Sequence, residues 1–374
     1  MNRRSAFIYH DLLSRHILRE GHVMVPTRLR YTYELLESYG AFDLQNSLLI
    51  EPRQATEEEI RTFHTSEYVS AVQSLGRGED KYNPSTYNFS DQGDNPVFPE
   101  MYQASLLSTG ASLTAAEMVS TGQVDVAFNC SGGLHHAMPG WASGFCIFND
   151  PVIAIKYLLG KGFRVAYVDI DAHHGDGVQY AFYNSDQVLT ISLHQSGAYL
   201  FPGTGFVHEM GEGKGFGYSV NVPLYPHTND KIYLWVFDEV VAPLVKAFKP
   251  DILATQLGMD SHFRDPIAQL GLTVQGHASL VAQLGQLSSR WIAFGGGGYD
   301  IAAVARGWSL DFGVMLGEEW PDEIPMFYQE RYGLKTLRDH EVATIDTGML
   351  ASARRFAEES VAEIKKRIFP LHYL

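Results

Sequence analysis

Short apolar runs alternate with amphipathic stretches along most of the chain. The apolar runs are rich in β-branched and aromatic residues and lie at residues 5–9, 124–129, 164–170, 188–193, 251–257 and 290–294. Helical periodicity marks residues 101–120, 150–159, 231–248, 276–287, 301–316 and 349–368. Strands that alternate with helices favour a parallel sheet covered on both faces. The sequence therefore predicts an α/β fold with a central, mostly parallel β-sheet and helices on both faces.

The 374 residues are interpreted as one domain, residues 1–374, because the chain contains no repeat and no low-complexity linker. The polar stretch at residues 76–96 is rich in Gly, Asp, Asn and Ser. Such a composition indicates a long surface loop within the domain.

Composition narrows the classes of function. Apolar residues make up 45% of the chain and charged residues 19%, which is typical of a globular protein. The 28 Lys and Arg residues against 43 Asp and Glu give a net charge of −15. A phosphate backbone repels such a protein, so we expect no direct nucleic-acid binding and favour a cationic substrate or partner.

Cysteine usage and the apolar runs point to a cellular compartment. Cys130 and Cys146 are too few for a disulfide framework, and we expect two free, partly buried thiols. The apolar run after Arg3 and Arg4 is too short for a signal peptide, and no run approaches the ~20 apolar residues that span a bilayer. The expectation is a cytoplasmic protein without a membrane partner.

Polar residues capable of chemistry follow four of the predicted strands. They lie at residues 131–136, 171–176, 258–260 and 295–299. In open α/β sheets, ligands bind outside the carboxyl ends of the strands. The four clusters are therefore predicted to form one site at that edge of the sheet.

Asp169, Asp171 and His173 alternate along the end of a strand, so their side chains share one face. Two carboxylates and an imidazole suit a divalent metal. A catalytic metal usually takes three protein ligands, and Asp260 at another strand end is the natural further donor. The alternative is that the carboxylates cap a helix, His173 is a core residue and Asp260 belongs to a turn.

The adjacent pair His135 and His136 is a candidate for acid–base catalysis, with Asp169 and Asp176 as orienting partners. The alternative is a pair of exposed or core histidines. The glycine run at residues 295–298 lacks the lysine of a phosphate-binding loop. It would instead present the Tyr299 hydroxyl to an oxyanion, the alternative being a core tyrosine.

Five motifs together resemble the zinc-dependent histone deacetylase family, especially its bacterial members of the acetoin-utilisation type. They are residues 132–137 (GGLHHA), 142–146 (ASGFC), 169–177 (DIDAHHGDG), 201–205 (FPGTG) and 295–299 (GGGGY). The resemblance covers about residues 21–308, and residues 320–374 are expected to be a C-terminal helical extension of the same domain. Residues 138–141 read Met-Pro-Gly-Trp where many relatives carry charges, so the rim that faces a protein substrate is expected to differ.

The resemblance implies a metal-dependent amidohydrolase that removes acetyl or other short acyl groups from the ε-amine of lysine in proteins or peptides. It implies zinc, with ferrous iron as the alternative, on Asp171, His173 and Asp260. His136 would accept a proton from water and deliver it to the leaving amine. The remaining implied roles are electrostatic assistance by His135, orientation of the two imidazoles by Asp169 and Asp176, and polarisation of the carbonyl by Tyr299.

Matching positions also imply a substrate tube and two structural potassium sites. The tube would be lined by Gly144, Phe145, His174, Phe201, Ile267 and Gly297. Asp94 would hold substrate amides at the rim, and Arg28 would lie at an acetate channel, unless it is a solvated surface charge. The first potassium site would comprise Asp169, Asp171, His173, Ser192 and Leu193, and the second Phe182, Ser185, Val188 and Tyr218.

Other functions remain open at this stage. An acetylpolyamine amidohydrolase would use the same metal and tyrosine, and the acidic net charge suits a polyamine. No long insertion narrows the channel, which favours acyl-lysine. A non-catalytic acyl-lysine-binding protein would have lost a ligand, a histidine or the tyrosine, and all are present. An arginase-like hydrolase would need a second metal, for which Ser261 and His262 do not supply the expected carboxylate.

Overall fold

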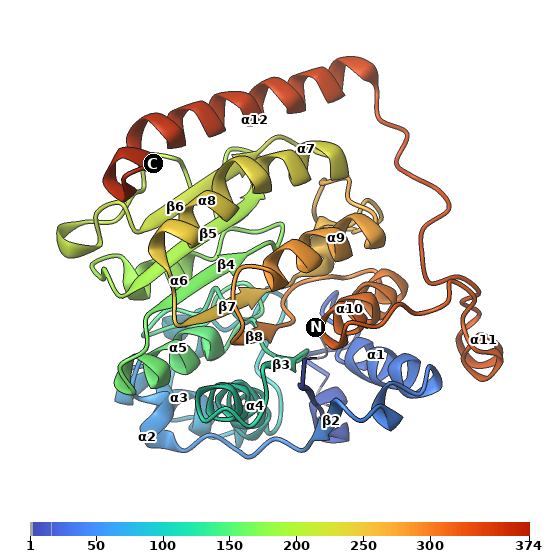
Figure 1. Cartoon of the computed structure of the whole chain (residues 1–374). Coiled ribbons are helices and arrows are strands. Elements are labelled where there is room, and N and C mark those ends of the chain that lie inside the picture. Colours follow the sequence, from blue (N-terminus) through green and yellow to red (C-terminus); the bar gives the residue numbers. More distant parts are fainter. Residues whose placement is uncertain (1–2, 16) are drawn as a thin grey trace.

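The computed structural model describes residues 3–15 and 17–374, and in these residues eight strands form one sheet whose neighbours all run parallel (Figure 1). The order across the sheet is β2-β1-β3-β8-β7-β4-β5-β6. The strands are β1 (Ser5–Ile8), β2 (Ser47–Ile50), β3 (Val126–Asn129), β4 (Val165–Asp169), β5 (Val188–Gln195), β6 (Ser219–Leu224), β7 (Ile252–Gln256) and β8 (Trp291–Phe294).

Helices cover both faces of the sheet, which confirms the predicted fold class (Figure 1). On one face lie α4 (Met101–Ser120), α5 (Asp150–Gly160) and α6 (Asp176–Phe182), with α3 (Ser66–Gly76) packed on α4. On the other lie α1 (Thr27–Ser38), α7 (Asp230–Val236), α8 (Ala242–Phe248), α9 (Val274–Gly285) and α10 (Ile301–Leu316). Alternate residues of each strand face the two cores, so Tyr167 packs on the first side and Val168 on the second.

All six predicted strands are present, but both edge strands escaped the sequence pattern. β2 is only four residues long, and β6 contains Pro223, a residue that argues against a central strand but is tolerated at an edge. The predicted helix 231–248 is α7 followed by a π-helical segment, Phe237–Val241, and then α8.

Of the two C-terminal helices, α12 (Thr347–Arg367) lies along β6 and covers that edge of the sheet, whereas α11 (Met326–Tyr332) lies beside α1 (Figure 1). The Ser360 hydroxyl donates to the Pro223 carbonyl at 3.0 Å, so a side chain satisfies backbone that has no further strand beside it. Cys130 and Cys146 are free as predicted, but both are buried where the sequence indicated partly buried thiols. Among the described residues, no helix has the length and apolar character needed to cross a membrane.

His64, which follows the short helix α2 (Glu57–Ile60), is buried and held in its neutral form. Its Nε2 accepts the backbone N–H of Asn149 at 2.9 Å, and burial lowers the pKa of His64 from 6.5 to about 3. Below pH 6.5 the unfolded chain binds a proton here that the folded chain does not, so acid lowers the free energy of unfolding. We expect His64 to lower the free energy of unfolding by about 2 kcal/mol when the pH falls from 7 to 5.

Urea unfolding of the wild type and of His64→Gln at both pH values measures this cost. The Gln amide oxygen can still accept the Asn149 N–H, but it does not titrate. The free energy of unfolding of the variant should therefore fall by about 2 kcal/mol less over this interval. An identical fall in both proteins would contradict the prediction.

Candidate active site

Three side chains of types that bind metals lie together at the carboxyl edge of the sheet. Asp171 and His173 follow β4, and Asp260 follows β7, the strand paired with it. One ligand atom from each residue lies within 4.8 Å of the others. His173 Nδ1 is 3.1 Å from Asp171 Oδ1 and 3.0 Å from Asp260 Oδ2. The structure thus brings the sequence-predicted trio into one buried cluster.

The electrostatics of this cluster fit a divalent cation. Asp260 is 0% exposed, and burial together with the charge of Asp171 raises the pKa of Asp260 to about 8. Two buried carboxylates disfavour each other's ionisation, and a cation between them removes that penalty. A Cβ on Gly297 would lie 2.0 Å from Asp260 Oδ2, so the glycine loop leaves room for the carboxylate. Oxygen and nitrogen donors in this number suit zinc.

Backbone and amide groups fix the orientation of both metal-site carboxylates. Asp171 Oδ2 accepts hydrogen bonds from Gln256 Nε2 at 2.6 Å and from the Gly297 N–H at 2.8 Å. Asp260 Oδ1 accepts the Ala172 N–H at 2.7 Å. In each carboxylate the other oxygen faces His173. Gln256 was not predicted from the sequence, because an amide at the end of a strand carries no signal of this role.

The two adjacent histidines are oriented by the carboxylates that the sequence suggested. His135 Nδ1 lies 2.7 Å from Asp169 Oδ2, and His136 Nδ1 lies 2.7 Å from Asp176 Oδ1. Their Nε2 atoms are 3.0 Å apart. Because each Nδ1 faces a carboxylate, the two Nε2 atoms face each other across a hydrogen bond, and these are the nitrogens that can exchange protons.

The two imidazoles differ in charge. Burial, with the charge of His135, lowers the pKa of His136 to about 4. Burial acts in the same direction on His135, but the charges of Asp169 and Asp171 outweigh it and raise the pKa of His135 to about 9. In the metal-free protein at neutral pH, one imidazole is therefore neutral and its neighbour is positive. A neutral imidazole is able to act as a general base.

Two side chains at the N-terminus of α5 hold the backbone of the loop that carries His135 and His136. Asn149 Nδ2 donates to the carbonyls of His135 and Ala137 at 3.1 and 3.0 Å. The Asp150 carboxylate accepts the N–H groups of Gly133 and Leu134 at 3.0 and 2.9 Å. This role of Asn149 and Asp150 was not predicted from the sequence, because an Asn-Asp pair at the start of a helix is also the ordinary pattern of an N-cap.

A cavity of about 230 Å³ leads from the surface to this cluster. Phe145 and Tyr299 form part of its wall, with ring centroids 5.7 Å apart. Desolvation raises the pKa of Tyr299 well above its usual value, so the phenol keeps its proton. The lining residues are Asp94, His136, Gly144, Phe145, His173, Leu200, Phe201, Ile267 and Tyr299.

Two residues predicted for the tube have other surroundings. His174 is buried beside the cavity, where its Nδ1 lies 2.8 Å from Thr204 Oγ1. Gly297 contacts the metal cluster through the N–H bond to Asp171. Neither is among the described residues that line the cavity.

The predicted potassium positions lie at two places along β5. Ser192 is paired with Asp169 in the β4–β5 register, and the Leu193 carbonyl accepts the Tyr233 hydroxyl at 2.9 Å. The second group lies where α6 meets β5, and the N–H of Ser185 donates to the Phe182 carbonyl at 2.9 Å. Val188 begins β5, and Tyr218 directly precedes β6. Potassium at these positions stays a prediction.

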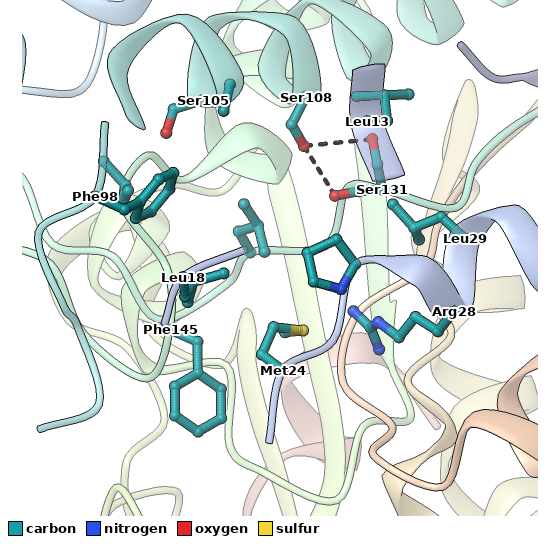
Figure 2. A pocket seen from close by; sticks show the side chains of 14 residues that line it. Leu13, Leu18, Met24, Arg28, Leu29, Phe98, Ser105, Ser108, Ser131 and Phe145 are labelled. Atoms are coloured by element: carbon teal, nitrogen blue, oxygen red, sulfur yellow. Dashed lines mark hydrogen bonds between the residues drawn. The ribbon is translucent and has the colours of Figure 1, made fainter. Parts of the chain in front are cut away.

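Arg28 is 5% exposed, so the alternative of a solvated surface charge is wrong. Its guanidinium donates to the carbonyls of Gly298 and Gly296 at 2.9 and 2.7 Å. It lines a second cavity of about 110 Å³ that shares Phe145 with the first. Figure 2 shows the Arg28 guanidinium and the hydroxyl groups of Ser108 and Ser131 around this cavity.

The buried cluster at the carboxyl edge of a parallel sheet is typical of the site of an α/β enzyme that uses a metal. The chain belongs to the histone deacetylase family, because the family model for the histone deacetylase domain matches residues 22–315. It is therefore a deacetylase, a hydrolase that acts on amide bonds.

Similar proteins include bacterial and eukaryotic members of the family. Acetoin utilization protein AcuC of Bacillus subtilis (strain 168) is 40% identical over 331 residues, 86% of this chain and 85% of that protein. Histone deacetylase 1 of Homo sapiens is 36% identical over 369 residues, 98% of this chain and 74% of that protein. A solved HDAC homolog complexed with SAHA superposes with a TM-score of 0.87 at 32% identity, covering 97% of this chain and 100% of that chain. An HDAC homolog from Aquifex aeolicus gives a TM-score of 0.86 at 32% identity, covering 96% and 100%.

Proposed function

We propose that this protein removes acetyl or other short acyl groups from the ε-amine of lysine in proteins or peptides. The observation that carries the proposal is the cavity of about 230 Å³, whose walls include Phe145 and Phe201 and which reaches His136, His173 and Tyr299. Acylation removes the charge of lysine, so its methylene chain suits aromatic walls. Asp94 also lines the cavity and would accept the backbone N–H groups of a peptide substrate.

We propose zinc as the metal, with ferrous iron as the alternative, on Asp171, His173 and Asp260. Their donor set and their buried charge support this assignment. When bound, such a cation lowers the pKa of water towards about 7 and withdraws electrons from a carbonyl oxygen.

The histidines handle the protons in this proposal. Neutral His136 accepts a proton at Nε2 from the attacking water and then delivers it to the nitrogen of the leaving amine, with Asp176 holding its Nδ1–H. His135, whose Nδ1 faces the Asp169 carboxylate at 2.7 Å, would stabilise as a cation the negative charge that develops nearby. The Tyr299 hydroxyl donates to the carbonyl oxygen as that oxygen becomes negative. The products are a free amine and a carboxylate.

Arg28 is proposed to bind the carboxylate product. It is a buried cation, and its Nε has no hydrogen-bond partner among the described residues. Ser105, Ser108 and Ser131 also line the cavity of about 110 Å³ beside it (Figure 2). The guanidinium would bind the carboxylate there as acetate leaves the tube.

The proposed substrate is tested by an assay of the metal-loaded protein on a panel of acyl-lysine peptides of increasing acyl length and on acetylspermidine. We expect kcat/KM for the acetyl-lysine peptide to exceed that for acetylspermidine by about 10-fold or more. The opposite order would contradict the proposal and favour an acetylpolyamine amidohydrolase. Binding of the peptides without hydrolysis would indicate a non-catalytic acyl-lysine-binding protein. A hydroxamate should inhibit the hydrolysis if the metal takes part.

A further inference from the structure

Tyr299 follows a glycine run that does not fix its own conformation. Gly296 and Gly298 have φ values of +114° and +122°, which side-chain-bearing residues rarely adopt. The position of the phenol therefore depends on hydrogen bonds from outside the run. Up to Gly298, these bonds include those from Arg28, the bond from the Gly297 N–H to Asp171 at 2.8 Å, and the bond from the Met259 N–H to the Gly297 carbonyl at 3.0 Å.

At Tyr299 itself the backbone is held by Asp265. The Tyr299 N–H donates to Asp265 Oδ2 at 2.9 Å. The other oxygen, Oδ1, accepts the N–H groups of Ile267 and Ala268 at 3.0 and 3.1 Å. Asp265 is 9% exposed, and no described Lys, Arg or His forms an ion pair with it. Three backbone N–H groups therefore surround this one carboxylate.

Asp265 joins the segment that carries Tyr299 to the segment that carries Ile267. Tyr299 and Ile267 both line the cavity of about 230 Å³. Tyr299 would contact the reacting carbonyl, and Ile267 would contact the substrate stem. A shift of Asp265 would therefore move the phenol relative to the substrate.

We propose that Asp265 is a positioning residue that holds Tyr299 against the acyl carbonyl and fixes its distance from the substrate-contacting residue Ile267. The inference rests on the function proposed above for Tyr299. A carboxylate is required because it has two acceptor oxygens and no donor, and it meets N–H groups on both sides. An asparagine at this position would turn its NH₂ group towards the N–H groups of one segment, and the hydrogen bonds to that segment would be lost.

Asp265→Asn is the first test, with Asp265→Ser as a second variant that retains a single acceptor. Misplacement of a catalytic group by about 1 Å costs up to about 100-fold in rate, so we expect kcat to fall by about 10- to 100-fold. KM should change by less than about threefold, because the phenol acts mainly on the transition state. In a Tyr299→Phe background the same substitution should change kcat by less than about threefold, because the two residues act as a unit.

A matched control is Asp230→Asn. Asp230 is a half-buried carboxylate that accepts the N–H and the hydroxyl of Thr273 at 2.9 and 2.7 Å, and it lines neither cavity described above. Its replacement should leave kcat unchanged. If Asp265→Asn lowered kcat equally in the wild type and in Tyr299→Phe, the proposal would be overturned.

A second readout needs neither metal nor substrate. In protein labelled with 3-fluorotyrosine, the ¹⁹F resonance of Tyr299 is assigned by its loss in Tyr299→Phe. Asp265→Asn should shift or broaden that resonance and leave the others in place. An unchanged resonance would contradict the inference, whereas absence of hydrolysis in the wild type would contradict the proposed function alone. Loss of cooperative thermal unfolding in both Asp265 variants would also overturn the inference, because the residue would then serve the fold as a whole.

Discussion

Asp260→Asn is expected to abolish metal retention and with it nearly all hydrolysis. The variant keeps the shape of the side chain and an oxygen for the Ala172 N–H, which Asp260 Oδ1 accepts at 2.7 Å. It loses the charge that would bind the cation together with Asp171 and His173. Removal of a residue behind a metal ligand typically costs about 10- to 100-fold in metal affinity, and loss of a ligand's charge should cost more.

The folded state should tolerate this substitution. Burial and the charge of Asp171 raise the pKa of Asp260 to about 8, so without a cation this carboxyl is mostly protonated at pH 7. A neutral amide then replaces a nearly neutral acid, and the thermal midpoint of the metal-free protein should shift by only about 1–2 °C. Metal per chain, measured after gel filtration, and the thermal midpoint together separate loss of metal from loss of fold.

The buried pair of Asp311 and His277 supplies a matched control. It joins α10 to α9 away from the sheet edge, with 3.3 Å between His277 Nδ1 and Asp311 Oδ1. Asp311→Asn should leave metal content and kcat unchanged. Full metal content in Asp260→Asn would show that the cluster is not the metal site.

Much of the site could be predicted from the sequence because parallel sheets place all strand ends of one direction at one edge. The segments that carry His136, Asp171, Asp260 and Tyr299 follow four strands, and the β3-β8-β7-β4 order makes those strands neighbours. The period of two along a strand also predicted that Asp171 and His173 share a face.

The parts that escaped prediction depend on contacts between distant segments. Gln256, Asn149, Asp150 and Asp265 act through hydrogen bonds to backbone groups or side chains far along the chain. Their residue types also occur at caps and turns, so their local sequence has no distinguishing pattern. Arg28 was ambiguous for a related reason, since burial of a cation is decided by what packs around it.

His136→Ala is expected to lower kcat by about 10²- to 10⁴-fold and to change KM little, because the imidazole exchanges a proton in the transition state. The structure gives a specific reason to assign this role to His136 and not to His135. Burial and the charge of its neighbour lower the pKa of His136 to about 4, so its Nε2 carries a lone pair and no proton at neutral pH. His135, whose pKa is raised to about 9, already carries a proton there.

Chemical rescue shows whether His136→Ala loses activity because the general base is missing or because packing is lost. His136 lines the cavity, so its removal enlarges a space that free imidazole can enter from solvent. Added imidazole should restore part of the kcat of His136→Ala, whereas His277→Asn, a change at a buried imidazole outside the site, should need no rescue. The metal content of His136→Ala should equal that of the wild type, because the metal ligands are unchanged. If His136→Ala kept more than about a tenth of the wild-type kcat, the neutral imidazole would not be the general base, and proton transfer would have to be assigned to another group in the cavity.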